Sequence, residues 1–234
     1  MKQALNIFSK EFKSYFVSPI AYIVIAIFLL VTGWFFFSTF FIYKQATLRN
    51  FFSLLPYIFS MIIPAVTMRL FSEEMNSGSY EILMTYPVTF SDVIVGKFSA
   101  AVAFIAVMLA PTLLYGVTIS MVGTLDPGPV IGGYIGAVLL GALFTAVGVF
   151  ASSLTHNQII AFIIGMTICF TLTLIDRMLY FLPESLLGFL SYLGANYHFS
   201  NIAKGIIDSR DLLYFVSVIF IALYGTNLVL QEKK

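Results

Sequence analysis

The chain has 234 residues, of which 60% are apolar and only 10% are charged. A soluble domain usually carries roughly 25% charged residues, so this composition excludes a water-soluble globule and indicates a membrane protein. The net charge of +1, with no Lys/Arg-rich run, argues against nucleic acid as a partner. A single cysteine, Cys169, excludes a disulfide or a Cys-based metal framework within one chain.

Residues 1–17 have the pattern of an amphipathic helix, with apolar side chains recurring on one face and basic or polar ones opposite. The apolar face comprises Leu5, Phe8, Phe12, Tyr15 and Phe16. This pattern predicts a helix that lies in the headgroup plane of a membrane. A secretory signal peptide is the alternative, but no small-x-small cleavage site follows the apolar run.

Six apolar segments follow, and each is long enough to cross a bilayer as a helix. They lie near residues 19–42, 51–70, 93–122, 130–152, 158–181 and 211–230. An even number of spans puts both termini on one side, together with seven Lys or Arg residues against five on the other side. The three lysines before the first span weigh most in orientation, so we expect both termini to be cytoplasmic. The sequence therefore predicts an all-α integral membrane protein.

The fourth span carries small residues at four-residue spacing, which lets helix backbones approach closely. These residues are Gly133, Ala137, Gly141 and Thr145. Such a ladder serves either packing within the chain's own bundle or a dimer interface. The first interpretation is favoured, because ladders of this kind are common in multi-span proteins.

The connection between the second and third spans, residues 71–92, does not read as a passive linker. Two adjacent carboxylates end the span, an Asn-Ser-Gly-Ser stretch follows, and a short apolar turn ends at Pro87. Tyr80, Leu83 and Met84 are three or four positions apart, so they can share one helix face and fit a groove on a partner protein. Residues 89–92 read as a capping box that starts the third span.

These residues resemble a known signature. Arg69…Glu73-Glu74…Gly78-Ser79-Tyr80-Glu81-Ile82-Leu83…Pro87, followed by Val93…Gly96-Lys97, is similar to the pattern between the second and third spans of ABC-2 type permease subunits. The resemblance covers the whole chain as one transmembrane domain, residues 1–234. Length and arrangement are most like the gliding-motility type of these permeases.

The resemblance implies an ABC-2 (type V exporter-like) fold with six transmembrane helices. Residues 1–17 would be the interfacial connector helix, 71–92 the cytoplasmic coupling loop, and 182–208 an outer re-entrant segment. The loop would sit in a cleft of a cytoplasmic ATPase. The implied contact residues are Arg69, Glu73, Glu74, Gly78, Ser79, Tyr80, Glu81, Leu83, Met84 and Pro87.

The chain itself lacks the G-x-x-x-x-G-K-[ST] motif that cradles nucleotide phosphates, because Gly96-Lys97 is followed by Phe98. We therefore expect no enzyme activity or cofactor in this chain, with ATP and Mg held by a separate ATPase. His156 and His198 have no second ligand at metal spacing, so we expect no metal site.

The partners implied by the resemblance are two ATPase copies, a second permease copy or paralogue, and an accessory subunit with an outer-side domain, all in a bacterial cytoplasmic membrane. Two functions stay open. The chain is either a permease that couples ATP hydrolysis to export, or a non-transporting component that passes an ATPase-driven conformational or mechanical signal to an outer partner. An ion-coupled carrier is disfavoured, because the spans lack mid-membrane carboxylates.

Overall fold

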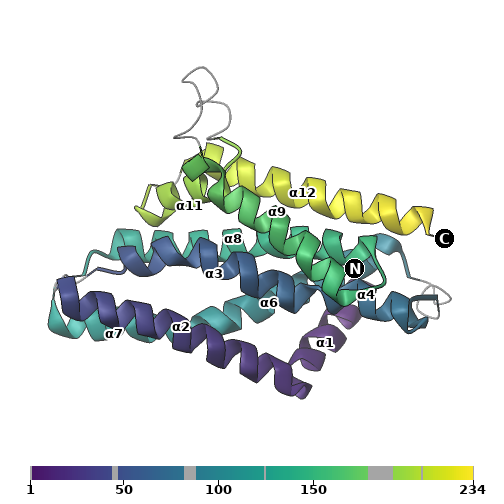
Figure 1. Cartoon of the computed structure of the whole chain (residues 1–234), viewed down its shortest axis with the longest axis horizontal. Coiled ribbons are helices and arrows are strands. Elements are labelled where there is room, and N and C mark those ends of the chain that lie inside the picture. The colour runs from purple at the N-terminus through teal and green to yellow at the C-terminus, as the bar shows by residue number, and fades with distance from the viewer. Residues whose placement is uncertain are drawn as a thin grey trace.

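A computed structural model describes residues 2–43, 47–81, 88–123, 125–178, 192–206 and 208–233. Within these ranges every regular element is a helix and no strand is present (Figure 1). The elements are α1 (Lys2–Val17), α2 (Pro19–Tyr43), α3 (Arg49–Thr67), α4 (Arg69–Asn76), α6 (Phe90–Leu109), η1 (Ala110–Thr112), α7 (Leu113–Val122), α8 (Pro127–Leu154), α9 (Gln158–Met178), α11 (Ala195–Ala203) and α12 (Ser209–Glu232).

Six helical segments among the described residues are long and apolar enough to cross a membrane, as the sequence predicts. The third predicted span, 93–122, differs in one respect, because a 3-10 turn at Ala110–Thr112 separates α6 from α7. Pro111 has no backbone N–H and cannot continue the ladder of helical hydrogen bonds. The hydroxyl of Thr112 also donates to the carbonyl of Leu109 at 2.7 Å.

Both chain termini lie at the same end of the bundle (Figure 1), as six spans require. We call this the terminal end; it also holds α4, the last turn of α8 and the first turn of α9. The opposite end holds the first turns of α3, α8 and α12 together with α11. The segment between the second and third spans is therefore on the same side as the two termini.

Helix α8 lies at the centre and contacts α3, α4, α6, α9, α11 and α12. It begins where the sequence predicts a tight turn: the Asp126 carboxylate accepts a hydrogen bond from the Gly128 N–H at 3.1 Å, and Pro127 occupies the first turn. This is the usual chemistry of a helix start. The bundle is thus built around the span with the most small residues.

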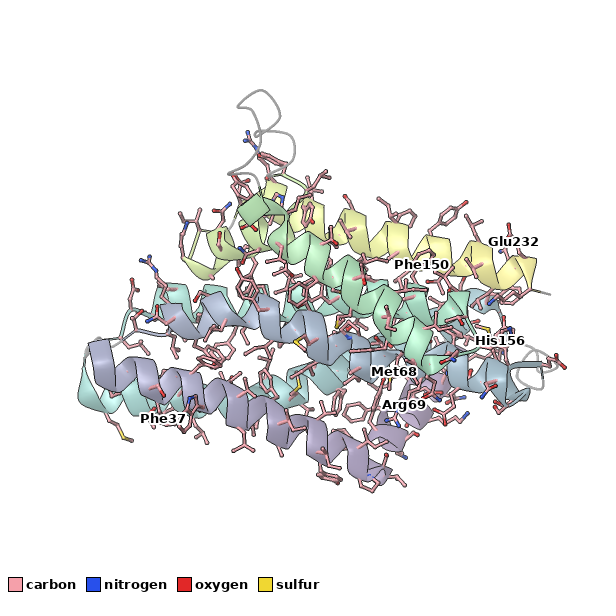
Figure 2. The ribbon with its side chains drawn as sticks, viewed as in Figure 1. Phe37, Met68, Arg69, Phe150, His156 and Glu232 are labelled. Atoms are coloured by element: carbon pink, nitrogen blue, oxygen red, sulfur yellow. The ribbon has the colours of Figure 1, made fainter. Side chains whose placement is uncertain are left out.

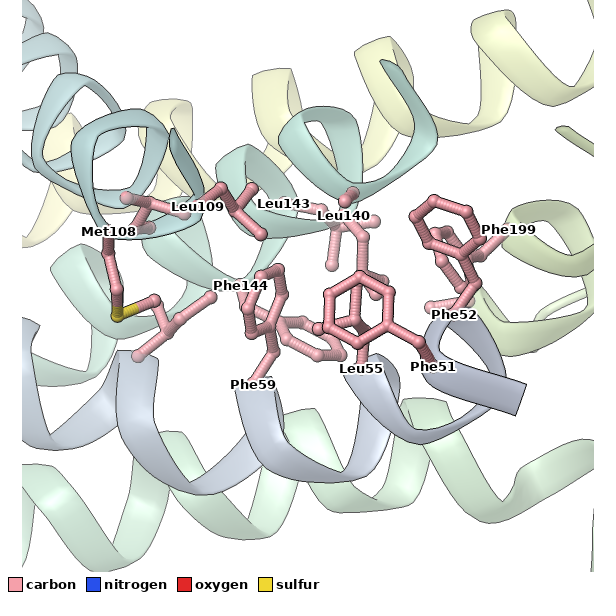
Figure 3. Packing of buried hydrophobic residues seen from close by; sticks show 14 of the residues in the cluster. Phe51, Phe52, Leu55, Phe59, Met108, Leu109, Leu140, Leu143, Phe144 and Phe199 are labelled. Atoms are coloured by element: carbon pink, nitrogen blue, oxygen red, sulfur yellow. The ribbon is translucent and has the colours of Figure 1, made fainter. Parts of the chain in front are cut away.

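Large apolar side chains fill the space between α3, α6 and α8 (Figure 3). Phe52, Leu55 and Phe59 of α3 meet Leu140 and Phe144 of α8, and all five are buried. In a bilayer the lipid chains are as apolar as these side chains, so close packing rather than exclusion of water holds the helices together. A second buried cluster, which includes Phe71, Tyr80 and Phe104, lies at the terminal end.

The small-residue ladder of α8 faces into this bundle. A Cβ added at Gly133 would overlap the Phe52 ring, and one added at Gly141 would come within 3.0 Å of the Ile105 side chain. Ala137 is fully buried. These residues allow α3 and α6 to approach α8 within one chain.

Helix α1 packs along the first half of α6. A Cβ at Gly96 would come within 2.8 Å of the Ile7 side chain and 3.0 Å of the Ala4 carbonyl oxygen. Tyr15 stacks on Phe104 with ring centroids 4.9 Å apart. Of the predicted apolar face, Tyr15 is buried, whereas Leu5 is 64% exposed. The face that packs on α6 is instead centred on Ile7, Glu11 and Tyr15.

Candidate functional site at the terminal end

Helix α4 continues the second span beyond its predicted end at residue 70. Met68 separates α3 from α4, and the Ser152 hydroxyl of α8 then accepts hydrogen bonds from the N–H groups of Phe71 at 2.8 Å and Ser72 at 3.2 Å. The first N–H groups of a helix have no partner within it, so Ser152 satisfies two of them. The first part of the predicted loop is therefore a helix fixed to the centre of the bundle.

The Asn-Ser-Gly-Ser stretch forms a closed turn. Gly78 has φ of 71°, in the left-handed region that favours glycine. The Ser77 N–H donates to the Glu73 carbonyl at 3.0 Å, and the Ser77 and Ser79 hydroxyls are 2.9 Å apart. Gly78 thus ends α4 and turns the chain toward the predicted contact residues.

Lys97 of α6 joins three helices. Its ammonium donates to Glu74 of α4 at 2.7 Å and to Glu11 of α1 at 3.1 Å. The ammonium also lies 5.4 Å from the centre of the Phe71 ring, within the range of a cation–π contact. Only 1% of Lys97 is exposed. We call Glu11, Glu74 and Lys97 the charge clamp.

A recess of about 300 Å³ lies beside the charge clamp, between α1 and α4. Besides the three clamp residues, its lining includes Lys10, Arg69 and Glu73. The Arg69 guanidinium lies 6.0 Å from the centre of the Tyr15 ring. The labelled Arg69 in Figure 2 marks this part of the terminal end. Burial and the neighbouring Glu11 raise the pKa of Tyr15 above its usual value, so its hydroxyl stays protonated.

The structure separates the implied contact residues into two groups. Glu73, Ser79 and Glu81 are exposed at the terminal end. Glu74 is paired with Lys97, and Tyr80 is 8% exposed with its ring against Phe71. Burial and the Glu74 carboxylate raise the pKa of Tyr80 to about 12. Gly78 is half-buried, Arg69 lines the recess, and Leu83, Met84 and Pro87 lie outside the described residues.

The capping box predicted at residues 89–92 is confirmed. The Thr89 hydroxyl accepts a hydrogen bond from the Asp92 N–H at 3.2 Å and donates to the Asp92 carboxylate at 2.7 Å. Because Thr89 is the N-cap of α6, this pair fixes where α6 begins. The charge clamp lies two turns further along the same helix.

Sequence reasoning did not identify Glu11, Lys97 or Ser152 as members of this site. Glu11 and Lys97 each had a signal in the sequence. Lys97 is a cation inside an apolar span, and such residues usually face a partner within the bundle. Glu11 is three positions after Phe8 and four before Tyr15. Residues at these spacings share a helix face, so a carboxylate lies on the apolar face of α1.

The opposite end has a separate buried polar cluster in the predicted re-entrant segment. His198 of α11 meets the Asp211 carboxylate of α12 at 2.6 Å through Nδ1 and the Tyr192 carbonyl at 2.9 Å through Nε2. The His198 and Tyr214 rings stack at 4.0 Å. The re-entrant segment is predicted at 182–208, and residues 182–191 and Ile207 lie outside the described ranges. The described part of the segment contains one helix, α11.

The comparisons with known proteins agree with this architecture. Residues 5–191 match the family model described as ABC-2 family transporter protein. None of the curated proteins matches the chain. The matched range contains most of α1, the charge clamp and five of the six spans. Membership implies a partnership with an ABC-type ATPase subunit. The chain therefore belongs to the ABC-2 transporter family and is a multi-pass transmembrane permease component of an ABC transporter.

Proposed function

We propose that this chain couples ATP hydrolysis on a separate ATPase subunit to export of a substrate across the membrane. The observation that carries the proposal is the arrangement of the terminal end. There, α4 is hydrogen-bonded to the central helix through Ser152, while the following turn exposes polar side chains away from the bundle. A partner that moves this turn would therefore act directly on the spans.

The proposed ATPase contact consists of the exposed residues Glu73, Ser79 and Glu81, together with Leu83, Met84 and Pro87 of the implied motif. Glu73 would provide the electrostatic part of the contact. Glu74 and Tyr80 have inward contacts, so their contribution would be to hold the turn in place. ATP and Mg would be bound by the ATPase and not by this chain.

The proposed assembly contains two permease chains above two ATPase copies in a bacterial cytoplasmic membrane, with both termini of this chain in the cytoplasm. Family resemblance of the gliding-motility type supports an accessory subunit with a domain on the outer side. The position of α1, α4 and both termini at one end of the bundle supports the common cytoplasmic placement of these elements.

The experiment is a purification of the tagged chain from native membranes in mild detergent. Bound proteins are identified by mass spectrometry and ATP hydrolysis is measured in the eluate. We expect a P-loop ATPase to co-purify with the unaltered chain, and less of it with Glu73→Gln. Glu232→Gln is the matched control, because Glu232 is an exposed carboxylate at the same end but on α12 (Figure 2).

Equal recovery of the ATPase with Glu73→Gln and Glu232→Gln would remove Glu73 from the contact. Absence of any P-loop ATPase from the unaltered preparation would contradict the proposed coupling itself. Once the complex is in hand, ATP-dependent accumulation of lipids or amphipathic compounds in inverted vesicles distinguishes export from a non-transporting signalling role.

A further inference from the structure

The charge clamp connects parts of the chain that are far apart in sequence and differ in function. Glu11 is on α1, Glu74 is on the helix that leads to the proposed ATPase contact, and Lys97 is on the third span. The clamp side chains are only 2% exposed for Lys97, 15% for Glu11 and 20% for Glu74. One ammonium group is thus the direct polar link between three separate helices.

Charge is not needed to attach these helices to each other. Helix α1 already packs on α6 through Gly96 and Ile7 and through the Tyr15–Phe104 stack. Helix α4 is already fixed to α8 by Ser152. Buried ion pairs contribute little net stability, because removal of both ions from water is costly, and apolar replacements often hold a fold equally well. A charge pair adds a defined geometry. A carboxylate that moves away leaves the Lys97 ammonium without one of its two partners.

One carboxylate of the clamp also has an incomplete set of hydrogen bonds. Within the described part of the chain, the second carboxylate oxygen of Glu74, Oε2, is buried without a hydrogen-bond partner. A buried acceptor in this condition is costly, so Glu74 depends on its single contact with Lys97. A displacement of α4 that separates the two groups is therefore opposed strongly, and α6 is drawn along with α4.

We propose that Lys97 is a positioning residue for coupling: through Glu74 and Glu11 it makes α4, α6 and α1 move together when the ATPase displaces the turn after α4. This inference rests on the proposed function. It assigns α1 an active part, since Glu11 would pass the displacement to the interfacial helix. The pathway runs from the ATPase to α4, then through the Lys97 ammonium to α1.

The test compares a chain with the clamp and a chain in which the clamp is replaced without leaving an unpaired charge. The replacement is the triple variant Glu11→Gln, Glu74→Gln and Lys97→Met. Lys10→Gln is the matched control, because Lys10 lines the same recess but lies outside the clamp. The thermal midpoint of each variant is measured first, and we expect the triple variant to keep a midpoint close to that of the unaltered chain.

Motion is then read from spin-label distances in the ATPase-bound complex, before and after trapping with ATP and vanadate. One label pair, at Asn76→Cys and Glu232→Cys, reports α4 against α12; the other, at Lys13→Cys and Glu232→Cys, reports α1 against α12. All three positions are exposed. Cys169→Ala provides the background, and labelled chain is diluted with unlabelled chain so that distances within one chain dominate.

In the unaltered chain and in Lys10→Gln, we expect both distances to change on trapping. In the triple variant we expect the α4 distance to change and the α1 distance to stay constant. Lys97→Arg keeps a cation at the position and should restore part of the α1 change. If the triple variant does not fold, Glu11→Gln alone should abolish the α1 response, because it removes only the link to α1.

An α1 change of equal size in the triple variant and the unaltered chain would overturn the inference. So would an α4 change without an α1 change in the unaltered chain, or no change at either pair in a complex that contains the ATPase. The proposed function is tested separately, by co-purification of the ATPase and by ATP-dependent accumulation of substrate in inverted vesicles.

Discussion

The two ends of the bundle each contain a buried charged cluster. The clusters differ in how far apart their residues lie in the sequence and in the side chains that form them. At the terminal end, Lys97 binds carboxylates from two other helices, 86 and 23 residues away in sequence. At the opposite end, His198 pairs with Asp211, only 13 residues away. The first cluster holds distant helices together, whereas the second closes one local connection between α11 and α12.

The chemical difference lies in the donors, because an ammonium group carries three N–H bonds and an imidazole ring carries at most two. In His198 both ring nitrogens face oxygen acceptors, so only the doubly protonated ring donates to both. The terminal end is therefore linked by one ammonium group across three helices, and the opposite end by one imidazole ring between α11 and α12.

The comparison predicts the largest loss of stability at the clamp. Lys97→Ala removes the cation and leaves two partly buried carboxylates close together, which should lower the free energy of unfolding by about 3–5 kcal/mol. Reversible unfolding in mixed micelles with increasing dodecyl sulfate measures this change. Lys10→Ala, at the same recess, should change the free energy by less than about 0.5 kcal/mol. Similar effects of the two variants would mean that Lys97 has no special role.

The opposite end should be less sensitive. Asp211→Asn keeps the size of the side chain but weakens the hydrogen bond to the buried His198 ring, at a cost of about 2 kcal/mol. The same unfolding measurement applies, with Glu232→Gln as an exposed control expected to be neutral. A loss larger than that of Lys97→Ala would reverse the order of the two ends.

Docking of α1 provides a third test of the terminal end. Gly96→Ala places a methyl group against Ile7 and the Ala4 carbonyl, so we expect a loss of about 1–2 kcal/mol and faster amide hydrogen exchange along α1. Gly116→Ala is the matched control, because its nearest neighbour, the Leu48 side chain, is at an ordinary 3.7 Å. In that helix alanine should be neutral or stabilising. Unchanged exchange in α1 would contradict close packing at Gly96.

The smallest expected effect is at the turn. Gly78→Ala meets no neighbouring atom within 4 Å, so its cost is only that of a side chain in the left-handed region, about 1 kcal/mol. Gly78→Asn should recover part of this loss, because asparagine tolerates that conformation better. Comparison of the two variants in the unfolding assay checks the cause. Equal stability of Gly78→Ala and the unaltered chain would argue against a left-handed Gly78.

Much of the fold follows from local patterns. Apolar runs of span length locate the membrane helices, and Thr89 and Asp126 start α6 and α8 through side-chain hydrogen bonds that neighbouring residues alone determine. The predicted boundaries were less accurate where charged residues suggested the end of a span. The sequence predicts that the second span ends at residue 70 and that a loop begins at 71, but Ser152, 80 residues away from Ser72, holds this part of the chain in a helix.

The same reason explains what the sequence does not reveal at the candidate site. Glu73 and Glu74 are adjacent and chemically identical, yet one is exposed and the other is paired with Lys97. Tyr80 resembles an exposed apolar contact but packs inward on Phe71. These outcomes depend on how α1, α4 and α6 pack in three dimensions, and helix spacing within one segment carries no such information.

The 3-10 turn at Ala110–Thr112 has a consequence for the third span. Changes in the direction of a helix usually occur at proline, and Pro111 lies in this turn. Before the turn, α6 carries Lys97. After it, Tyr115 of α7 stacks on Phe36 of α2 with ring centroids 4.7 Å apart, and Tyr134 of α8 donates to the Thr112 carbonyl at 2.7 Å. The two helices of the third span are therefore held by different neighbours, with α1 and α4 beside α6 and α2 beside α7.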